Sequence, residues 1–415
     1  MDFVYAMTNG FFILLQVVAA VVGMYQVALS LFGLRRRHRT KEHPPTKSFA
    51  VLIAAHNEEK VIAPLIENLK HLDYPKELYD VFVICDNCTD RTADIAREAG
   101  AIAYERFEPE KRGKGFAIEW MLGQLWKRPR EYDAVVMFDA DNLVSPNFLQ
   151  VMNNKLCEGA KVVQGYLDVK NPFDSWVSIS YGCSYWYTNR MWQLARYNLH
   201  LPNALGGTGV CVETALLKEI GWGATSLTED LEFGVRCVMR GVYPTWAHDA
   251  RVYDEKPLTL KASMRQRLRW MQGHFDCFHR YFWSLLRESL RKRSLAMFDS
   301  ALYLFQPMRM LIVLLTTGML YFQVFSPGFF ELTNISTLFP NWFWVSMNIF
   351  LFGQLPLAML LERVPLKALL GLVILPAFTL TWFPVTTAAF FTRKNRVWDH
   401  TLHTRAIRLD EIRSR

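Results

Sequence analysis

Apolar residues gather in four long blocks along the chain, at residues 11–34, 300–325, 342–361 and 366–391. None of these blocks holds more than one charged residue. An α-helix rises about 1.5 Å per residue, so about 20 apolar residues are enough to cross roughly 30 Å of hydrocarbon. The pattern therefore predicts a membrane protein with one apolar helix near its start and an apolar region near its end.

Basic residues at the ends of these blocks predict the topology. Five residues with Arg35 at their head follow the first block directly, and they are all basic. The positive-inside rule places that end in the cytosol and the N-terminus outside. A cleaved signal peptide is disfavoured, because no basic residue precedes the block and the block is too long.

The last block makes the position of the tail ambiguous. Three further crossings would leave the tail outside, whereas its many Lys and Arg residues argue for the cytosol. Pro376 and Pro384 interrupt the last block, so it is a candidate for a broken or re-entrant segment. We favour the charge evidence and expect a cytosolic tail.

Between the first and second blocks, strand-like and helix-like patterns alternate. Buried strands are predicted at residues 49–55, 81–85, 101–104, 134–138 and 160–167, and helices at 60–69, 89–99 and 116–126. This alternation is typical of an α/β fold with a mostly parallel sheet and helices on both faces. In such sheets, ligands bind beyond the carboxyl ends of the strands.

Three of the predicted strands end in polar residues that could carry chemistry. The first ends in His56-Asn57-Glu58-Glu59, the second in a run from Asp86 to Asp90, and another in Asp139-Ala140-Asp141. Each cluster alone fits a turn or a helix cap equally well. All three at one edge would crowd like charges, which favours a bound cation, and Mg²⁺ or Mn²⁺ suits such hard oxygen ligands.

A basic, glycine-rich run at Lys111-Arg112-Gly113-Lys114-Gly115 is a candidate phosphate contact or a plain exposed turn. The chain contains neither GxxxxGK[ST] nor GxGxxG, so the P-loop and dinucleotide-binding interpretations lack their main support.

In chain order, these motifs resemble those of the membrane-embedded family 2 glycosyltransferases, which include cellulose, chitin, hyaluronan and poly-N-acetylglucosamine synthases. The strand end at 55–58, Asp86, the basic run and Asp139-x-Asp141 are followed by Thr228-Glu229-Asp230 and by Gln266-x-x-Arg269-Trp270. The resemblance covers residues 48–282 and includes Gln272-Gly273 after the last motif. The tail element from Trp398 to Arg405 is similar to a short element that ends many relatives.

The resemblance implies a GT-A fold, a UDP-sugar donor and a divalent metal. It places the uridine against Ala55, His56, Glu58 and Asp86, with Lys114 nearer the nucleotide. Asp139 and Asp141 would hold ribose and the metal-bound diphosphate, and Asp230 would be the general base. Glu229, Gln266, Arg269 and Trp270 would bound the acceptor and the leaving diphosphate.

Elementary chemistry agrees with these roles. Inverting sugar transfer needs a carboxylate that removes the proton of the acceptor hydroxyl, and Arg hydrogen bonds stabilise the departing diphosphate. Thr228-Glu229-Asp230 also reads as an ordinary helix start, with acids favoured by the helix dipole. The Gly206–Gly209 loop and Gln164 are further candidates near the acceptor and the donor, and a plain turn explains the loop almost as well.

Composition narrows the remaining choices. The formal charge of the chain is +8. The basic residues border the predicted membrane segments, which disfavours a role in nucleic-acid binding. Seven scattered cysteines fit a reducing cytosol, and Cys85-x-x-Cys88 is a weak redox or metal pair. Residues 176–197 and 256–293 mix basic and aromatic residues, which is typical of helices at the headgroup level, with a packed core helix as the alternative.

Together these features predict five parts: a transmembrane helix at 1–34, a cytosolic GT-A domain at 35–255, interfacial helices at 256–298, a membrane region at 299–392 and a basic tail at 393–415. We expect an enzyme of the plasma (inner) membrane that extends a β-linked polysaccharide from a UDP-sugar. The alternative is a glycolipid synthase that adds sugars to a membrane lipid, and a nucleotide-binding receptor is the non-enzymatic alternative. Membrane lipids are expected partners, and an accessory export or regulatory subunit would be a separate chain.

Overall fold

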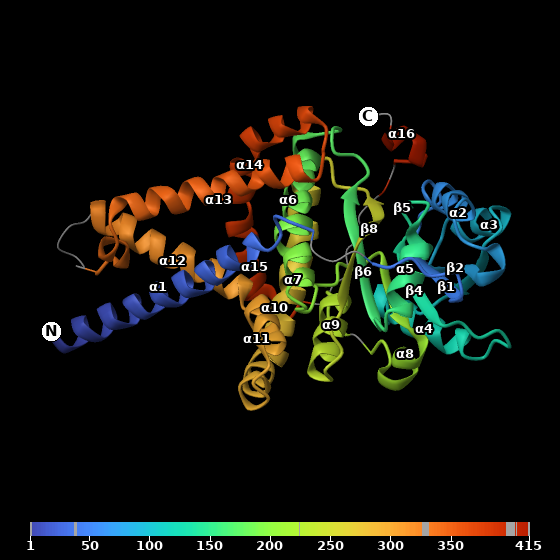
Figure 1. Ribbon diagram of the computed structural model, residues 1–415, viewed down its shortest axis with the longest axis horizontal. Coiled ribbons are helices and arrows are strands. Elements are labelled where there is room, and N and C mark those ends of the chain that lie inside the picture. Colours follow the sequence, from blue (N-terminus) through green and yellow to red (C-terminus); the bar gives the residue numbers. More distant parts are fainter. Residues whose placement is uncertain are drawn as a thin grey trace.

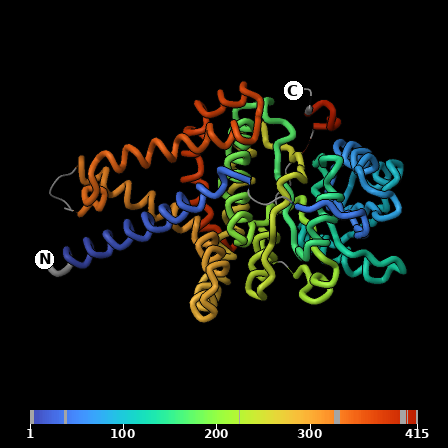
Figure 2. Tube along the Cα trace, viewed as in Figure 1, coloured from blue at the N-terminus to red at the C-terminus, as the bar shows by residue number. Residues whose placement is uncertain are grey.

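A computed structural model describes residues 2–36, 40–223, 225–325, 332–395, 403 and 405–413. A sheet domain forms one end of the molecule, and long apolar helices project from it in one direction (Figure 1). The chain enters through helix α1 (Asp2–Leu31) and builds the sheet domain, then returns to the helical part (Figure 2). The structure thus combines an α/β sheet domain with helices that are long and apolar enough to span a membrane.

The sheet domain contains a mixed sheet with the strand order β3-β2-β1-β4-β7-β6-β8-β5. Neighbouring strands are parallel from β3 to β4 and between β6 and β8, whereas β7 runs antiparallel to both β4 and β6, and β5 runs antiparallel to β8. The strands are Phe49–Ala55 (β1), Tyr79–Asp86 (β2), Ile102–Arg106 (β3), Ala134–Asp139 (β4), Leu143–Val144 (β5), Val162–Val169 (β6), Val210–Glu213 (β7) and Thr245–Asp254 (β8).

All five predicted strands are present, each displaced by no more than two residues at either end. The sequence pattern did not reveal β5, β7 and β8. Because β7 enters between β4 and β6 in the opposite direction, the expected mostly parallel sheet is a mixed one.

The apolar strands are buried on both faces, which explains their near-continuous hydrophobic runs. On β1, Phe49, Val51 and Ile53 pack into one core, and Ala50 and Leu52 pack into the other. The first core also receives helices α2 (Ile62–Lys70), α3 (Thr92–Glu98) and α5 (Phe148–Cys157). The second receives α4 (Lys114–Leu125), α8 (Thr214–Ile220) and α9 (Glu229–Met239).

Strand register brings the predicted polar ends together. Ala55 of β1 pairs with Cys85 of β2, and Ala54 pairs with Asp139 of β4. The segments that follow these three strands therefore leave the sheet side by side at one edge, as the sequence predicts.

Two elements join the sheet domain to the apolar helices. Helix α10 (Leu260–Arg291) is 32 residues long and turns into α11 (Leu295–Leu304). Helix α6 (Trp176–Thr188) begins with a capping box at Ser175 and continues through a short π-helical segment into α7 (Leu194–Asn198). Because α6 packs with apolar residues of the C-terminal region and most of its side chains are buried, the packed-helix alternative describes it better than a position on the lipid surface.

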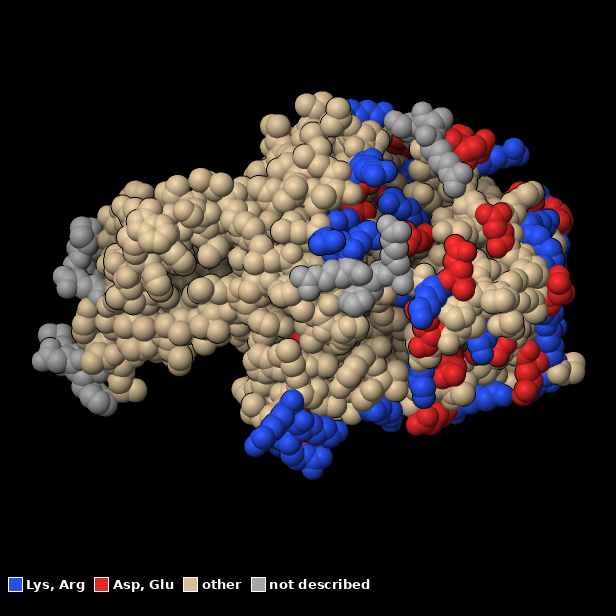
Figure 3. All heavy atoms as spheres, in the orientation of Figure 1, with Lys and Arg blue, Asp and Glu red and all other residues tan. Residues whose placement is uncertain are grey.

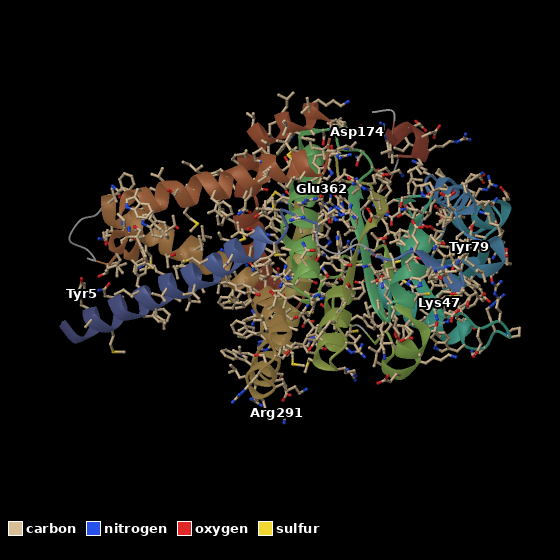
Figure 4. All side chains as sticks on the ribbon, in the orientation of Figure 1. Tyr5, Lys47, Tyr79, Asp174, Arg291 and Glu362 are labelled. Carbon is tan, nitrogen blue, oxygen red and sulfur yellow. The ribbon has the colours of Figure 1, made fainter. Side chains whose placement is uncertain are left out.

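Helices α1, α12 (Gln306–Phe325) and α13 (Asn341–Leu361) form the projecting part. Far from the sheet domain, the side chain of Asn9 on α1 donates to Thr333 Oγ1, which lies between α12 and α13, over 3.0 Å. At the near ends, Arg190 donates to the carbonyl of Gly33 (2.7 Å) and to Glu362 (3.2 Å, labelled in Figure 4). One buried guanidinium thus ties the end of α1 to the end of α13.

The last apolar block forms a 3₁₀ turn (Leu366–Leu370), α14 (Gly371–Leu380) and α15 (Trp382–Thr392). At its start, Gly371 lies so close to α6 that a Cβ atom there would be 2.7 Å from Ile179 Cγ1. At its end, the Gln272 side chain on α10 donates to Thr392 Oγ1 over 2.9 Å. Both ends of this block therefore pack against helices that adjoin the sheet domain, as the re-entrant alternative expects, and the block is also one of four segments long and apolar enough to cross a membrane.

The tail returns to the same side. The Arg405 backbone N–H donates to Glu255 (3.0 Å), and its guanidinium bonds to Asp174 (3.2 Å). The favoured placement of the tail beside the sheet domain agrees with these contacts. Of the predicted element at Trp398 to Arg405, only His403 and Arg405 lie within the described residues.

This arrangement makes a prediction about sidedness. In intact cells, an impermeant maleimide should label Thr337→Cys and Met7→Cys at the far ends of the helices, but not Asn395→Cys, which should react only after lysis. The native cysteines lie in the sheet domain and its adjoining helices α6 and α10, so they should remain silent in intact cells. Equal labelling of Thr337→Cys and Asn395→Cys would show that residues 366–392 cross the membrane.

Candidate active site

The ends of β1 and β2 form the first wall of the candidate site. Asn57 and Asn87, directly after these strands, both adopt a positive φ, and this turns the chain sharply at the sheet edge. His56 Nδ1 lies 2.6 Å from the carbonyl oxygen of Asp86 and links the two turns. The buried Asp86 carboxylate accepts hydrogen bonds from Arg106 and from the Asn87 side chain. The four residues predicted to line a uridine, Ala55, His56, Glu58 and Asp86, therefore lie along one short stretch of the edge.

Lys114 forms the centre of the site. It is the first residue of α4, after Gly113 at φ 121°, so its side chain enters the site from the basic run. Its ammonium group pairs with Asp139 and donates to the carbonyl of Gly207 over 2.7 Å. Burial lowers the pKa of Lys114, but the carboxylates around it outweigh this effect and raise the pKa above its ordinary value, so the side chain is charged.

Asp230 lies in the first turn of α9, against the glycine loop. A Cβ atom on Gly207, which has φ 79°, would lie 3.5 Å from Asp230 Oδ2. Burial, and then the charge of Glu229, raise the pKa of Asp230 to about 7. Burial also raises the pKa of Glu229, although Lys114 opposes the shift. A carboxylate with a pKa close to neutral is suited to accept a proton.

The Gln266–Trp270 motif lies on α10 and faces α6. Gln266 accepts a hydrogen bond from the Tyr181 hydroxyl (3.2 Å), and the Trp270 ring meets Tyr181 edge to face at 6.3 Å. Three residues on, Gly273 passes so close to Thr228 that a Cβ atom would be 2.7 Å from its backbone nitrogen. The glycine after the motif therefore lets α10 touch the segment that leads to Asp230.

Asp139 and Asp141 are held by different partners. The Asp139 carboxylate pairs with Lys114, whereas Asp141 Oδ2 accepts the Glu255 backbone N–H (3.0 Å) and lies 3.8 Å from His403 Nε2. Within the described part of the chain, no group of three His, Cys, Asp or Glu side chains is placed to hold a metal ion. Mg²⁺ commonly takes only one or two protein carboxylates and completes its shell with phosphate and water, so this donor set fits a metal that arrives with a diphosphate.

Gln164 and the Cys85–Cys88 pair differ in the structure from their predicted roles. Gln164 is fully buried; its side chain donates to the Thr208 carbonyl (2.9 Å) and accepts the Gly206 N–H (2.8 Å). It supports the glycine loop instead of facing a ligand. Cys85 and Cys88 are both free thiols, so they form no disulfide.

Three side chains that contact the predicted site residues were not predicted from the sequence. Arg106 neutralises Asp86, and His403 Nδ1 lies 2.9 Å from Glu58 Oε1. Glu232 accepts the backbone N–H groups of Thr225 and Ser226, each at 2.7 Å. A lone Arg at a strand end gives no signal, and a His 345 residues from its partner cannot be paired by spacing. Glu232 could have been noticed, because it follows Asp230 by two residues, but it reads as one more acid in a helix start.

Glu232 also reaches α10. Its other oxygen accepts hydrogen bonds from Arg280 (2.6 Å) and from the Tyr281 hydroxyl (2.8 Å). The Glu232 side chain is buried, and burial alone would raise its pKa. Each of its oxygens accepts two hydrogen bonds, and these bonds, led by the one from Arg280, outweigh burial and lower the pKa of Glu232. Glu232 thereby fastens the segment before Asp230 to the same helix that carries Gln266 and Trp270.

Comparison with known proteins is consistent with this geometry. The chain is 29% identical over 252 residues to the probable glycosyltransferase YdaM of Bacillus subtilis, a match that covers 57% of each protein. It is 27% identical over 292 residues to the beta-monoglucosyldiacylglycerol synthase of a Nostoc species, covering 66% of this chain and 58% of that protein. The chain thus matches less than two thirds of the length of these two relatives.

Two further similarities extend into the helical part. The poly-beta-1,6-N-acetyl-D-glucosamine synthase of Staphylococcus epidermidis is 22% identical over 354 residues, covering 83% of this chain and 81% of that protein. The solved mannosyltransferase PcManGT of Pyrobaculum calidifontis, in complex with GDP-Man and Mn²⁺, superposes with a TM-score of 0.61 at 16% identity, covering 93% of this chain and 98% of that one. This superposition supports the GT-A fold.

The family model described as "Glycosyltransferase like family 2" matches residues 44–273, more than half of the chain. The matched segment contains the sheet, the glycine loop, Asp230 and the Gln266–Trp270 motif. The chain belongs to the family 2 glycosyltransferases.

Proposed function

We propose that this enzyme transfers a sugar, with inversion, from a UDP-sugar to a hydroxyl group presented at the membrane, and that the acceptor is a growing β-linked polysaccharide. The observation that carries the proposal is the position of Asp230, a partly buried carboxylate between the glycine loop and the helix that bears Gln266 and Trp270. It lies beside Lys114, whose ammonium group suits a diphosphate and pairs with Asp139, a carboxylate suited to a metal ion.

Each group has a chemical task in this proposal. Asp230 accepts the proton of the acceptor hydroxyl as that oxygen attacks the anomeric carbon. Lys114 and Arg269 stabilise the negative charge that develops on the departing diphosphate, and Trp270 offers a flat apolar face to a sugar ring. Asp139 and Asp141 would hold Mg²⁺ or Mn²⁺, which supplies electrostatic stabilisation of the diphosphate when bound.

In the proposed orientation, the sheet domain lies on the cytosolic side of the plasma membrane, and nucleotide sugars are made in the cytosol. The basic residues after α1 and in the tail support this orientation. The match to the poly-N-acetylglucosamine synthase, which continues into the membrane helices, supports a polymer product.

A second acceptor, a membrane lipid, is favoured by one observation. A cavity of about 470 Å³ beside α12 is almost wholly apolar; among the described residues it is lined by Leu314, Leu315, Gly318, Met319, Phe322, Gln323 and Leu332. Apolar walls suit an acyl chain better than a hydrated glycan. The match to the glucosyldiacylglycerol synthase supports the same acceptor.

One experiment tests the function and separates the two acceptors. Purified protein in lipid nanodiscs is offered labelled UDP- and GDP-sugars, with EDTA or with Mn²⁺ restored, and the product is extracted with chloroform and sized. We expect UDP release that stops with EDTA and returns with Mn²⁺, and a long water-soluble product. A short chloroform-soluble product would assign the lipid acceptor, and absence of transfer from every donor would refute the proposal.

Replacing the proposed base gives a sharper test. Asp230→Asn should lower kcat by about 10²- to 10⁴-fold, because the amide cannot accept the proton, and should leave UDP binding nearly unchanged. Asp94→Asn, at an exposed position of α3, is the matched control and should retain activity. Turnover of Asp230→Asn at the wild-type rate would remove Asp230 from its assigned role.

The pH dependence follows from the raised pKa of Asp230. Because a base must be deprotonated to act, kcat/KM should rise with pH through an acidic limb whose midpoint lies near pH 7, and level off above it. In Glu229→Gln the neighbouring negative charge is absent, so the limb should move to lower pH. Measurement of kcat/KM from pH 5 to 9 checks both statements, and an unmoved limb in Glu229→Gln would contradict the assigned cause.

Glu232 should act as a positioning residue. Glu232→Gln keeps the size of the side chain but turns a donor toward two backbone N–H groups, so Asp230 loses part of its support. Hydrogen bonds to charged groups contribute about 1.5–3 kcal/mol, so we expect kcat to fall by roughly 10- to 100-fold while the KM for donor stays nearly constant. Glu288→Gln, near the exposed end of α10, is the control; equal kcat values in both variants would contradict the role.

A further inference from the structure

The turn between α10 and α11 carries a dense cluster of exposed cations. Arg287, Arg291, Lys292 and Arg293 are all exposed within seven residues, and Glu288 is the only acid among them. They form the blue projection at the lower edge of the molecule in Figure 3, and Figure 4 labels Arg291 there. We call residues 283–295 the basic corner.

The basic corner also exposes large apolar side chains. Trp283 is 67% exposed, Leu290 is 69% exposed and Leu295 is 60% exposed. On α10, Trp283, Arg287 and Leu290 are four and three residues apart, so they share one helix face. Exposed aromatic and aliphatic groups beside cations are typical of a helix at a membrane surface and unusual on a fully solvated one.

The opposite face of the corner is packed and rigid. Phe282 and Leu285 of α10 are buried with Met297 and Ala301 of α11 in one cluster. The exposed groups are therefore presented by a braced pair of helices, and their exposure does not result from a loose end.

The charge of the corner is only partly balanced. Glu288 accepts from Arg291 at 2.9 Å and from Lys292 at 3.4 Å. Among the described residues, no carboxylate lies within 4 Å of Arg287 or Arg293. Four cations and one acid leave a net charge of +3 on this short surface.

The position of the basic corner next to the apolar helices indicates which kind of molecule it contacts. Helix α11 leads into the membrane helix α12 with only Phe305 between them, and the Phe282 ring packs on the Phe305 ring at 5.7 Å. The corner therefore lies beside the near end of a membrane-spanning segment, on the side of the sheet domain, where headgroups lie. Clusters of Lys and Arg at this depth attract anionic lipids.

We propose that the basic corner is a binding surface for anionic phospholipid headgroups, with the Trp283, Leu290 and Leu295 side chains inserted at the boundary between the headgroups and the acyl chains. The occupant is a membrane lipid with a phosphate-based net negative charge. The surface is separate from the sugar-transfer site, which lies at the other end of α10, and it does not depend on the proposed activity.

Lipid retention by the full chain tests this proposal. The protein in maltoside micelles is incubated with equal amounts of phosphatidylglycerol and phosphatidylcholine, passed through gel filtration, and its retained lipid is counted by mass spectrometry. We expect a severalfold preference for phosphatidylglycerol that declines between 50 and 500 mM NaCl, because exposed charges are screened.

The variants assign the preference to the corner. The triple change Arg287→Gln, Arg291→Gln, Lys292→Gln should remove most of the preference. The matched triple change Lys127→Gln, Lys161→Gln, Lys218→Gln, at exposed positions of the sheet domain, should leave it intact. Trp283→Gln keeps every charge and should lower retention of phosphatidylglycerol by a smaller factor. Equal preference in the two triple variants, or no preference in the wild type, would overturn the proposal, as would stronger retention of an acidic oligonucleotide than of phosphatidylglycerol at the corner.

Discussion

The candidate site depends on one charge balance, in which the partly buried ammonium group of Lys114 lies among several acids. Lys114 pairs with Asp139, and the charges of Glu229 and Asp230 act on it as well. Without this cation, three carboxylates would face one another across the site, and nearby like charges favour protonation over ionisation. Its bond to the Gly207 carbonyl also fixes the glycine loop against which Asp230 rests. Lys114 therefore makes the acidic edge compatible with folding before any ligand binds.

The second constraint is the joint between the sheet domain and the membrane helices. Buried ion pairs form this joint: Arg190 with Glu362, and Arg196 with Asp299, which also accepts the Tyr25 hydroxyl. A buried pair is costly to break, because the remaining charge would be left without a partner. Helix α10 adds a direct link, since it carries Trp270, touches Thr228 through Gly273 and holds Glu232 through Arg280. The position of the segment that carries Asp230 is therefore coupled to helices that adjoin the apolar helical part.

The sequence was sufficient for the parts that depend on local pattern. Buried strands are continuous apolar runs, so β1, β2 and β4 and the acids that follow them were predictable, as was their meeting at one edge. Strand β7 is only four residues long and runs against its neighbours, so nothing local revealed that the sheet is mixed. The last apolar block has the composition of a crossing helix; its return to the sheet-domain side depends on contacts such as Gly371 with Ile179 and Gln272 with Thr392. The pairing of His403 with Glu58 joins distant parts of the chain, which only the folded structure brings together.

We propose that one sheet edge binds the nucleotide sugar next to Asp230. The most direct measurement is an experimental structure of the protein in nanodiscs with Mn²⁺ and a non-hydrolysable UDP-sugar. We expect the uracil near His56 and Asp86 and the diphosphate between Lys114 and the Asp139-x-Asp141 segment. The anomeric carbon should face Asp230 across a gap that admits one hydroxyl group. A nucleotide bound elsewhere, or a sugar turned away from Asp230, would contradict it.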